Sequence, residues 1–350
     1  MSTESIGNDI SVIIPCYNAE KWIDRCMKSI ICQTLGIDRI RIICVDDAST
    51  DRTLDCLLDW EKRYPANVLV IQCDENRRQG AARNFALDYV DTAYVTYVDA
   101  DDYLDNKCLE ILILVAEKSG AQMVSCEHIR DFSGDLCLSS VFSEKDLQYS
   151  ETYVKGADSR ENEIRFSSVD PQVWGRLLKT DFVRENALFF PEEVTYEDNL
   201  WRSMLACCIQ HYCKVDLPLY HYFVNNDSTV LTSDSIHHVD FLTVQMKKWD
   251  YLVTNGYYER FTDAVEFDFL HNCYLDFLKI ICFRYEEAPY PLFCLLQEVV
   301  RSRIPQGGNR NVYYENGFTE FQQLLLGFIT IDVSRSDFMN MVQLIRRNGI

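Results

Sequence analysis

The sequence of 350 residues has no Cys-x-x-Cys pair, although it contains 15 cysteines. A zinc framework or a small disulfide scaffold would need regular cysteine spacing, so neither fits this chain. Several cysteines stand inside apolar runs, among them Cys16, Cys44 and Cys126. Reduced thiols there act as small hydrophobic side chains. Since no signal-peptide pattern opens the chain either, we expect a protein of the reducing cytoplasm.

Long apolar runs and an excess of basic residues are absent too. No stretch reaches the roughly 18 uncharged apolar residues of a spanning helix, so no transmembrane segment is predicted. The sequence leaves open a peripheral contact with the inner face of a membrane. Lys and Arg number 34 against 54 Asp and Glu, a formal net charge of −20. Nucleic acid is not expected as a partner, because phosphate binding needs a basic surface.

Glycine-rich phosphate loops are also missing. No G-x-G-x-x-G follows the first predicted strand, and there is no P-loop, so a dinucleotide-binding Rossmann site lacks its phosphate loop. What the chain does have is the composition of a globular protein, with 47% hydrophobic and 25% charged residues. Its length predicts about two domains.

Short apolar runs alternate with helical patterns over the first part of the chain. The predicted strands are 10–15, 40–45, 68–73, 93–98 and 122–126, and the predicted helices are 20–31, 51–63, 81–89 and 109–118. This alternation predicts an α/β fold with a mostly parallel central sheet and helices on both faces.

The pattern changes in the second half. Residues 130–170 form a polar stretch that we interpret as an insertion or a loop, and 196–210 and 219–224 predict a helix and a last strand. Beyond Ser235, aromatic residues recur at helical spacing. We therefore predict a catalytic domain at 1–230 and a mainly helical domain at 231–350, which either shapes an acceptor site or forms a homodimer interface.

The acidic residues Asp99, Asp101 and Asp102 directly follow the fourth predicted strand. The carboxyl ends of strands are where open α/β sheets bind ligands. Clustered like charges are costly unless a cation neutralises them, and hard oxygen donors suit Mg²⁺ or Mn²⁺ entering with a substrate phosphate. The alternative is a solvated turn in which one Asp caps a helix.

Two further strands end in polar residues that could face the same crevice. Tyr17 and Asn18 follow the first strand, and Asp46 and Asp47 end the second. As an alternative, Asp46 and Asp47 cap the helix that follows them.

Six short motifs, in this order, resemble the family 2 glycosyltransferases, the inverting nucleotide-sugar enzymes of bacterial polysaccharide assembly. The motifs are SVIIPCYN at 11–18, VDDASTD at 45–51, GAARN at 80–84, VDADD at 98–102, WGRL at 174–177 and YEDN at 196–199. The resemblance implies a Rossmann-like GT-A fold, a divalent metal (Mn²⁺ or Mg²⁺), a nucleotide-sugar donor, expected to be a UDP-sugar, and a glycan or lipid-linked acceptor. Two departures are Ala48, where the family commonly has Gly, and the loop 76–80, which is longer than the usual Asn-x-Gly.

For the donor, the resemblance implies roles for five residues. Pro15 and Tyr17 would line the base pocket, with Asn18 beside them. Asp46 would accept a hydrogen bond from the base, as expected for uracil. Arg83 would contact the diphosphate or the sugar, although an arginine on a helix is often simply solvated.

The resemblance also implies the metal ligands. Asp99 and Asp101 match the family's Asp-x-Asp motif, with Asp101 as the direct ligand and Asp99 near the ribose or the ion. A divalent ion there would neutralise the charge that builds on the leaving phosphate. His221 is either a third ligand or phosphate contact, or a structural histidine.

Asp198 matches the residue that serves as base in the family. A carboxylate in reach of the acceptor hydroxyl contributes about 10²- to 10⁴-fold, and a single in-line displacement inverts the anomeric centre. The alternative for Glu197 and Asp198 is capping at a helix start. Trp174, Arg176 and Glu197 are candidates for the acceptor or sugar pocket, and Trp174 is otherwise a core residue.

Two other functions compete with a transferase. A nucleotidyltransferase that makes nucleotide sugars would need a Gly-rich basic loop after the first strand, where this chain has Pro15–Asn18. A non-catalytic sugar-binding relative would be favoured by loss of Asp101 or Asp198, and both are present.

Overall fold

The computed structural model describes residues 9–132, 147–166, 172–224 and 233–350. The chain divides into two compact units, and each is considered by itself. We call the first the sheet unit (Met1–Val154, Gln172–Glu193 and Cys208–Asn225) and the second the helical unit (Lys155–Pro171, Val194–Cys207 and Asn226–Ile350). Two stretches before residue 230 thus group with the C-terminal helices, and the predicted domains 1–230 and 231–350 stay a prediction.

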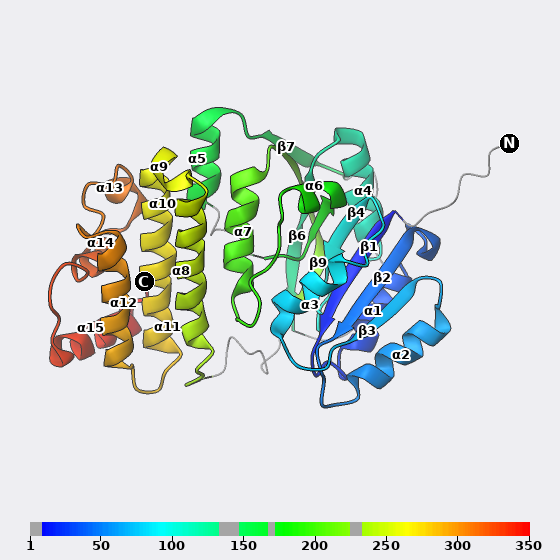
Figure 1. Cartoon of the computed structure of the whole chain (residues 1–350), viewed down its shortest axis with the longest axis horizontal. Coiled ribbons are helices and arrows are strands. Elements are labelled where there is room, and N and C mark those ends of the chain that lie inside the picture. Colours follow the sequence, from blue (N-terminus) through cyan, green and yellow to red (C-terminus); the bar gives the residue numbers. More distant parts are fainter. Residues whose placement is uncertain (1–8, 133–146, 167–171, 225–232) are drawn as a thin grey trace. The chain divides into compact units, whose positions relative to one another are not determined.

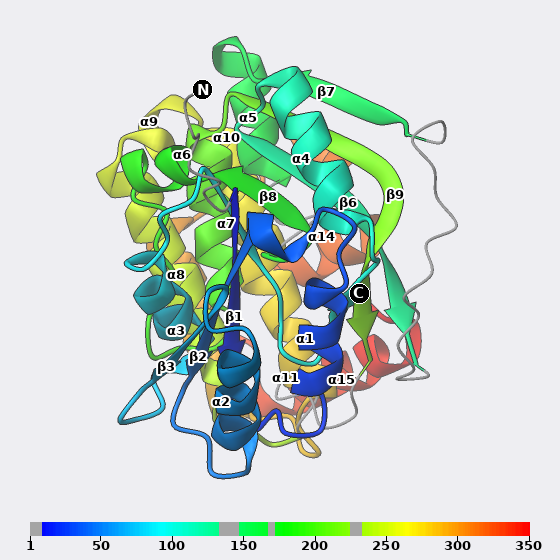
Figure 2. The same ribbon diagram turned by 90° about the vertical axis from the view of Figure 1, so that its right-hand side faces the viewer.

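The sheet unit is built on one mixed sheet with the order β3-β2-β1-β4-β8-β6-β9-β5, and β7 pairs with β9 (Figures 1 and 2). Its strands are β1 (Ile10–Cys16), β2 (Ile40–Asp46), β3 (Val68–Gln72), β4 (Tyr94–Tyr97), β5 (Tyr103–Leu104), β6 (Met123–Asp131), β7 (Tyr149–Tyr153), β8 (Arg176–Lys179) and β9 (His211–Phe223).

The first four strands form the parallel part of the sheet. β1 pairs in parallel with β2 and β4, and β2 pairs in parallel with β3. In this register Cys16 lies beside Asp46, so the ends of β1 and β2 are level. β8 then runs antiparallel between β4 and β6. The polar residues that follow β1, β2 and β4 consequently emerge at one edge.

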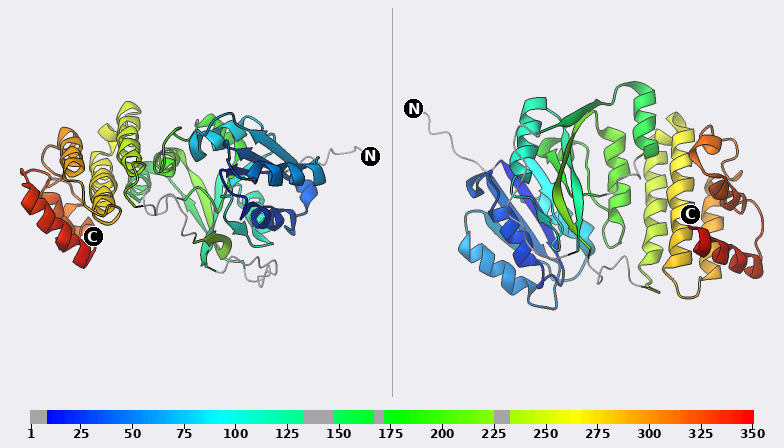
Figure 3. Two further views of the ribbon diagram at one scale, coloured as in Figure 1. Left: turned by 90° about the horizontal axis from the view of Figure 1, so that it is seen from below. Right: turned by 180° about the vertical axis from the view of Figure 1, so that it is seen from behind.

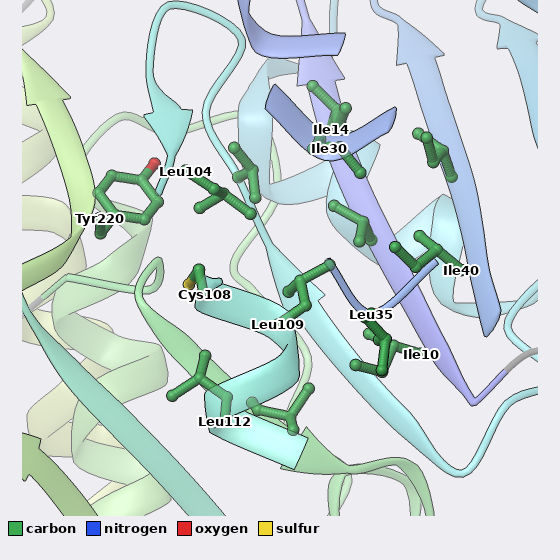
Figure 4. Packing of buried hydrophobic residues seen from close by; sticks show 14 of the residues in the cluster. Ile10, Ile14, Ile30, Leu35, Ile40, Leu104, Cys108, Leu109, Leu112 and Tyr220 are labelled. Atoms are coloured by element: carbon green, nitrogen blue, oxygen red, sulfur yellow. The ribbon is translucent and has the colours of Figure 1, made fainter. Parts of the chain in front are cut away.

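Helices cover this sheet because its central strands are apolar on both faces. All seven residues of β1 are buried. They are α1 (Ile23–Ile31), α2 (Thr53–Arg63), α3 (Arg78–Leu87), α4 (Cys108–Ser119) and α6 (Thr180–Glu185), with a short 3₁₀ turn at Ile37–Arg39. α1, α2 and α4 share one buried cluster with Ile10, Val12 and Ile14 of β1. Figure 4 shows part of it, including Leu109 and Leu112 of α4.

The helical unit contains α5 (Gly156–Phe166), α7 (Glu197–Cys208), α8 (His238–Thr254), α9 (Tyr257–Arg260), α10 (Thr262–Asp268), the π-helix Phe269–Asp276, α11 (Phe277–Phe283), α12 (Tyr290–Arg303), α13 (Tyr314–Gly317), α14 (Glu320–Gly327) and α15 (Arg335–Asn348). Several run side by side in Figures 1 and 3. The aromatic positions that the sequence singled out, such as Phe269, Tyr274 and Phe277, lie in its buried core. Among the described helices, none combines the length and apolarity needed to cross a bilayer.

The predicted strands and helices of the first 130 residues are confirmed, with ends that differ by a few residues. The structure adds β7, β8, α5 and the first half of β9, which the sequence pattern did not predict. β8 has four residues and β7 is mostly polar and exposed, so neither carries a clear strand period. Part of the predicted insertion, 133–146 and 167–171, lies outside the described residues.

Candidate active site

The acidic turn after β4 is organised around a buried carboxylate, Asp102. Its side chain is fully buried, and it accepts hydrogen bonds from the Tyr220 hydroxyl at 2.6 Å and from the Phe223 N–H at 2.8 Å. Burial, with the nearby charges of Asp101 and Asp99, raises the pKa of Asp102 well above its usual range. Asp102 thus connects β9 to the turn. The other two carboxylates of the turn, Asp99 and Asp101, are more accessible.

Asp99 is paired with the predicted phosphate-binding arginine. Arg83 Nη2 donates to Asp99 Oδ1 at 2.8 Å and to Gln79 Oε1 at 2.9 Å. The Arg83 guanidinium also lies 5.2 Å from the centre of the Phe190 ring. The Arg83 side chain is buried, so it is part of the site and not a solvated helix residue.

Two residues of α1 contact the backbone carbonyls of the acidic turn. Arg25 donates from Nη2 to the Asp101 carbonyl, and the Cys26 thiol lies 3.7 Å from the Asp99 carbonyl. The Arg25 guanidinium packs 4.4 Å from the Phe223 ring centre. This buried cation lowers the electrostatic cost of three carboxylates in one turn.

The loops after β1 and β2 are joined by Asn18. Its backbone N–H donates to Ser49 Oγ at 3.0 Å, and its Oδ1 accepts from the Thr50 N–H at 2.8 Å. The Tyr17 side chain before it is 50% exposed. Asn18 therefore positions the loops, while the Tyr17 ring is open to a ligand.

Asp46 carries a polar atom that needs a partner. The side chain is 1% exposed, and Oδ2 accepts from the Ser49 N–H at 3.3 Å. Its Oδ1 is buried and has no hydrogen-bond partner among the described residues. Buried acceptors are nearly always satisfied, so a donor on a ligand fits here. Pro15 lies buried in β1, next to the strand that ends in Asp46.

Asp47 organises the longer loop at 76–80. Its Oδ1 accepts from the Arg77 N–H at 2.9 Å, and Asn76 Nδ2 donates to its carbonyl at 3.2 Å. Burial raises the pKa of Asp47 despite the backbone hydrogen bonds. The loop is thus anchored to the end of β2, and the role of Asp47 is positioning.

Asn84, the last residue of the GAARN motif, anchors the chain segment that carries Phe190. Its Nδ2 donates to the Phe190 carbonyl at 2.9 Å and to Glu192 Oε1 at 3.1 Å, and its Oδ1 accepts from the Phe190 N–H at 2.8 Å. This clamp keeps the Phe190 ring against Arg83. Only the chain's return at 190–192, far away in sequence, reveals the role.

An aromatic wall rises beside the acidic turn. Trp174 stacks on Tyr220 at 4.3 Å and 11°, and on Tyr222 at 5.6 Å and 18°. Burial and the charges of Asp102 and its neighbours raise the pKa of Tyr222. Tyr220 and Tyr222 were missed, although the period of two in a strand places both on one face.

His221 lies on the other face of β9. It stacks on Tyr103 at 4.3 Å and 13°. Burial lowers the pKa of His221, and the carboxylates that oppose this shift are Asp105 and Asp131. Its role as a third metal ligand or phosphate contact stays a prediction.

Arg176, a candidate for the acceptor pocket, is buried in β8. Its Nε donates to the Gln172 carbonyl at 2.8 Å, and Nη1 lies 3.5 Å from Met123 Sδ. These contacts hold the segment that precedes β8 and carries Trp174.

Glu197 and Asp198 open α7 in the helical unit. Glu197 is buried and Asp198 is half-buried. Asp198 Oδ1 accepts from Asn199 Nδ2 at 3.0 Å, and Asn199 Oδ1 in turn accepts from Gln245 Nε2 at 3.4 Å. Two amides thus orient the carboxylate, whose role as base stays a prediction.

The sequence is similar to a family model and to known glycosyltransferases. Residues 11–141 match the model of glycosyl transferase family 2. A poly(ribitol-phosphate) beta-glucosyltransferase of Bacillus spizizenii is 30% identical over 220 residues, which are 62% of this chain and 32% of that protein. A processive diacylglycerol beta-glycosyltransferase of Mycoplasma genitalium is 23% identical over 331 residues, 87% of this chain and 93% of that protein. The chain therefore spans about a third of the Bacillus relative.

A solved structure is similar over nearly the whole chain. The crystal structure of S. aureus TarS residues 1–349 in complex with UDP-GlcNAc superposes with a TM-score of 0.68 at 19% identity, and the match covers 97% of this chain and 92% of that one. At this identity the likeness concerns the fold. It confirms the predicted GT-A architecture.

Proposed function

We propose that the chain, whose residues 11–141 match the model of glycosyl transferase family 2, transfers a sugar from a UDP-linked donor to a hydroxyl of a glycan or lipid-linked acceptor. The observation that carries this proposal is the ion pair between the buried Arg83 and the partly exposed Asp99, at the edge where β1, β2 and β4 end. Similarity to a poly(ribitol-phosphate) beta-glucosyltransferase and to a processive diacylglycerol beta-glycosyltransferase supports a glycan or lipid-linked acceptor.

The nucleotide would bind between the ends of β1 and β2. The unsatisfied Oδ1 of Asp46 would accept the uracil N–H, and the exposed Tyr17 ring would pack on the base. A buried acceptor without a partner makes binding specific for the base, because a base that lacks the donor N–H leaves the acceptor unpaired.

Asp101 and Asp99 are suited to hold Mn²⁺ or Mg²⁺, because both offer hard carboxylate oxygens from one turn. When bound, the ion neutralises the charge that develops on the leaving diphosphate. Arg83, which donates a hydrogen bond to Asp99, would supply a second positive group. The buried guanidinium keeps its orientation without an entropic cost at each turnover.

Asp198 would remove the proton of the attacking hydroxyl, with its carboxylate oriented by Asn199. One displacement at the anomeric carbon then inverts the configuration. The Trp174–Tyr222 wall offers a face on which an acceptor sugar can stack. Cysteines such as Cys16 and Cys44 lie buried in the core of the sheet unit, where reduced thiols act as small hydrophobic side chains, and we therefore place the reaction in the reducing cytoplasm, at the inner face of the membrane.

The test combines binding and turnover in the full chain. UDP binding, measured by calorimetry, should need Mn²⁺ or Mg²⁺ and weaken in Asp101→Asn, and donor turnover should stop with EDTA and return with the metal. Asp198→Asn should keep UDP affinity and lose about 10²- to 10⁴-fold in transfer. Asp181→Asn, at the start of α6, is the matched control and should leave both unchanged. UDP binding that ignores chelator and Asp101→Asn would overturn the metal role, and an active Asp198→Asn variant would remove Asp198 as base.

A further inference from the structure

A second group of metal-binding side chains lies at the edge of the sheet, at the β7–β9 pair. In this antiparallel pair Glu151 is opposite Cys213, and Tyr153 is opposite His211. Side chains two residues apart on a strand point to the same face. All four side chains therefore gather on one face of the pair.

We propose that Glu151, His211 and Cys213 form a Zn²⁺ site that fastens β7 to β9. One ligand atom from each residue lies within 4.8 Å of the others. His211 Nε2 already lies 2.7 Å from Glu151 Oε1. Zinc ligands in a tetrahedral site are separated by more than a hydrogen bond, so the ion enters as this pair opens slightly, and the Cys213 thiol releases its proton to solvent as the sulfur–metal bond forms.

The donor set selects the metal. One sulfur, one imidazole nitrogen and one carboxylate oxygen are the ligands of Zn²⁺, whereas Mg²⁺ and Mn²⁺ prefer oxygen alone. The proposed site and the oxygen-only turn at Asp99 and Asp101 are therefore distinct in chemistry. Three protein ligands leave a fourth position for water.

The surroundings support a built site. Tyr153 stacks on the His211 ring at 4.2 Å and 8°, and its hydroxyl donates to Glu151 Oε1 at 2.7 Å. Neighbours that orient ligands in this way raise metal affinity. Cys213 is buried, whereas Glu151 is exposed, so the three residues extend from the surface of the strand pair to its buried side.

The alternative is a half-exposed Glu151–His211 ion pair that happens to lie near a buried thiol. Such pairs contribute little to stability. The two readings differ in whether Cys213 becomes a thiolate bound to metal. Cobalt reports this directly, because Co²⁺ bound to thiolate has a charge-transfer band in the near ultraviolet and Zn²⁺ displaces it.

The experiment titrates the full chain, stripped with chelator, with Co²⁺ and then Zn²⁺. We expect one equivalent to give the thiolate band and Zn²⁺ to abolish it. Cys213→Ser should remove the band, and His211→Gln, at a partly exposed position that tolerates the change, should weaken Co²⁺ binding at least about tenfold. Cys32→Ser, at an exposed cysteine, is the matched control and should keep the band.

Two further readouts complete the test. Zn²⁺ should raise the melting temperature of the wild type and not that of His211→Gln, because only a ligand of the folded state stabilises it. Asp101→Asn should keep the thiolate band, so failure of the proposed transferase metal site and failure of this site are distinguishable. A wild type without the band, or a band equally strong in Cys213→Ser and His211→Gln, would overturn the proposal.

Discussion

Arg83 Nη2 lies 2.8 Å from Asp99 Oδ1, and the exposed fractions of the two side chains are 2% and 24%. The buried Arg83 of α3 thus forms an ion pair with Asp99, the first carboxylate of the acidic turn. The pair brings the charge that a diphosphate needs to the turn that would hold its metal. The pair also lowers the electrostatic cost of clustering three carboxylates in this turn.

Replacing Arg83 tests this relationship. Arg83→Met would leave Asp99 without its cation, and we expect the free energy of unfolding to fall by about 2–3 kcal/mol, below the full cost of breaking a buried pair because Asp99 is partly exposed. UDP affinity should fall about 10- to 100-fold. Arg83→Lys keeps the charge, so its unfolding free energy and UDP affinity should lie between those of the wild type and Arg83→Met. A Met variant with wild-type urea midpoint and UDP affinity would contradict the role.

Tyr220 links Asp102 and Asp99 through one hydroxyl. It donates to Asp102 Oδ2 at 2.6 Å and accepts from the Asp99 N–H at 3.2 Å. Tyr220→Phe leaves a buried carboxylate short of one donor, so we expect a loss of about 1–3 kcal/mol in unfolding free energy. Tyr222→Phe, on the same face of β9, is the control and should cost less than about 0.5 kcal/mol. Equal effects in denaturant titrations would argue against the link.

Ala48 stands in the left-handed region, with φ of 56°. A Cβ there is strained by about 1–2 kcal/mol, and part of this is offset by the greater flexibility of Gly in the unfolded chain. Ala48→Gly should therefore raise the free energy of unfolding by about 0.5–1 kcal/mol. Ala187, with φ of 48°, should respond in the same direction. Ala82→Gly, inside α3, is the opposite control and should destabilise by at least about 1 kcal/mol.

Asp51 gives the stability of the first loops a pH dependence. Its carboxylate accepts from the Thr53 N–H at 2.9 Å and from the Glu20 N–H at 3.2 Å. Burial raises the pKa of Asp51, but the hydrogen bonds from Thr53 and from the Glu20 and Asp51 backbone together outweigh it, and the pKa is lowered overall. An acid with a lower pKa in the folded state stabilises above its unfolded pKa, near 3.9, and loses this as pH falls through the folded value.

The measurement compares urea midpoints between about pH 6 and pH 2.5. Asp51→Asn should show a smaller loss of stability below about pH 4 than the wild type. Asp55→Asn, at an exposed position on α2, should keep the wild-type slope. If the Asp51 and Asp55 variants have the same slope, the hydrogen bonds around Asp51 do not act as described.

How much the sequence predicted is clearest at the acidic turn. The apolar run before Asp99 and the turn chemistry of the loop after β2 are local signals, and they located the two loops at the ends of β4 and β2. The sequence could not separate Asp102 from Asp99, because adjacent carboxylates look alike until the Tyr220 hydroxyl, more than a hundred residues away, buries one of them.

The residues around His221 also have roles that only long-range contacts reveal. Histidine was singled out for its chemistry, while the strand period of two presents Tyr220 and Tyr222 to Trp174. Asn84 likewise acquires its role from a chain segment that returns at Phe190. Such roles depend on contacts between distant residues, which no local pattern encodes.

By itself, the sequence determined the alternation of strands and helices in the first 130 residues, the loops that end β1, β2 and β4, and the helical character of the C-terminal part. These follow from hydrophobic periodicity and turn residues, which act over a few positions. Only the tertiary structure decided that β8 enters the sheet antiparallel between β4 and β6, that Arg83 pairs with Asp99, and that Glu151, His211 and Cys213 meet. The physical reason is that strand order and side-chain pairing are set by burial across the whole sheet, not by neighbours in sequence.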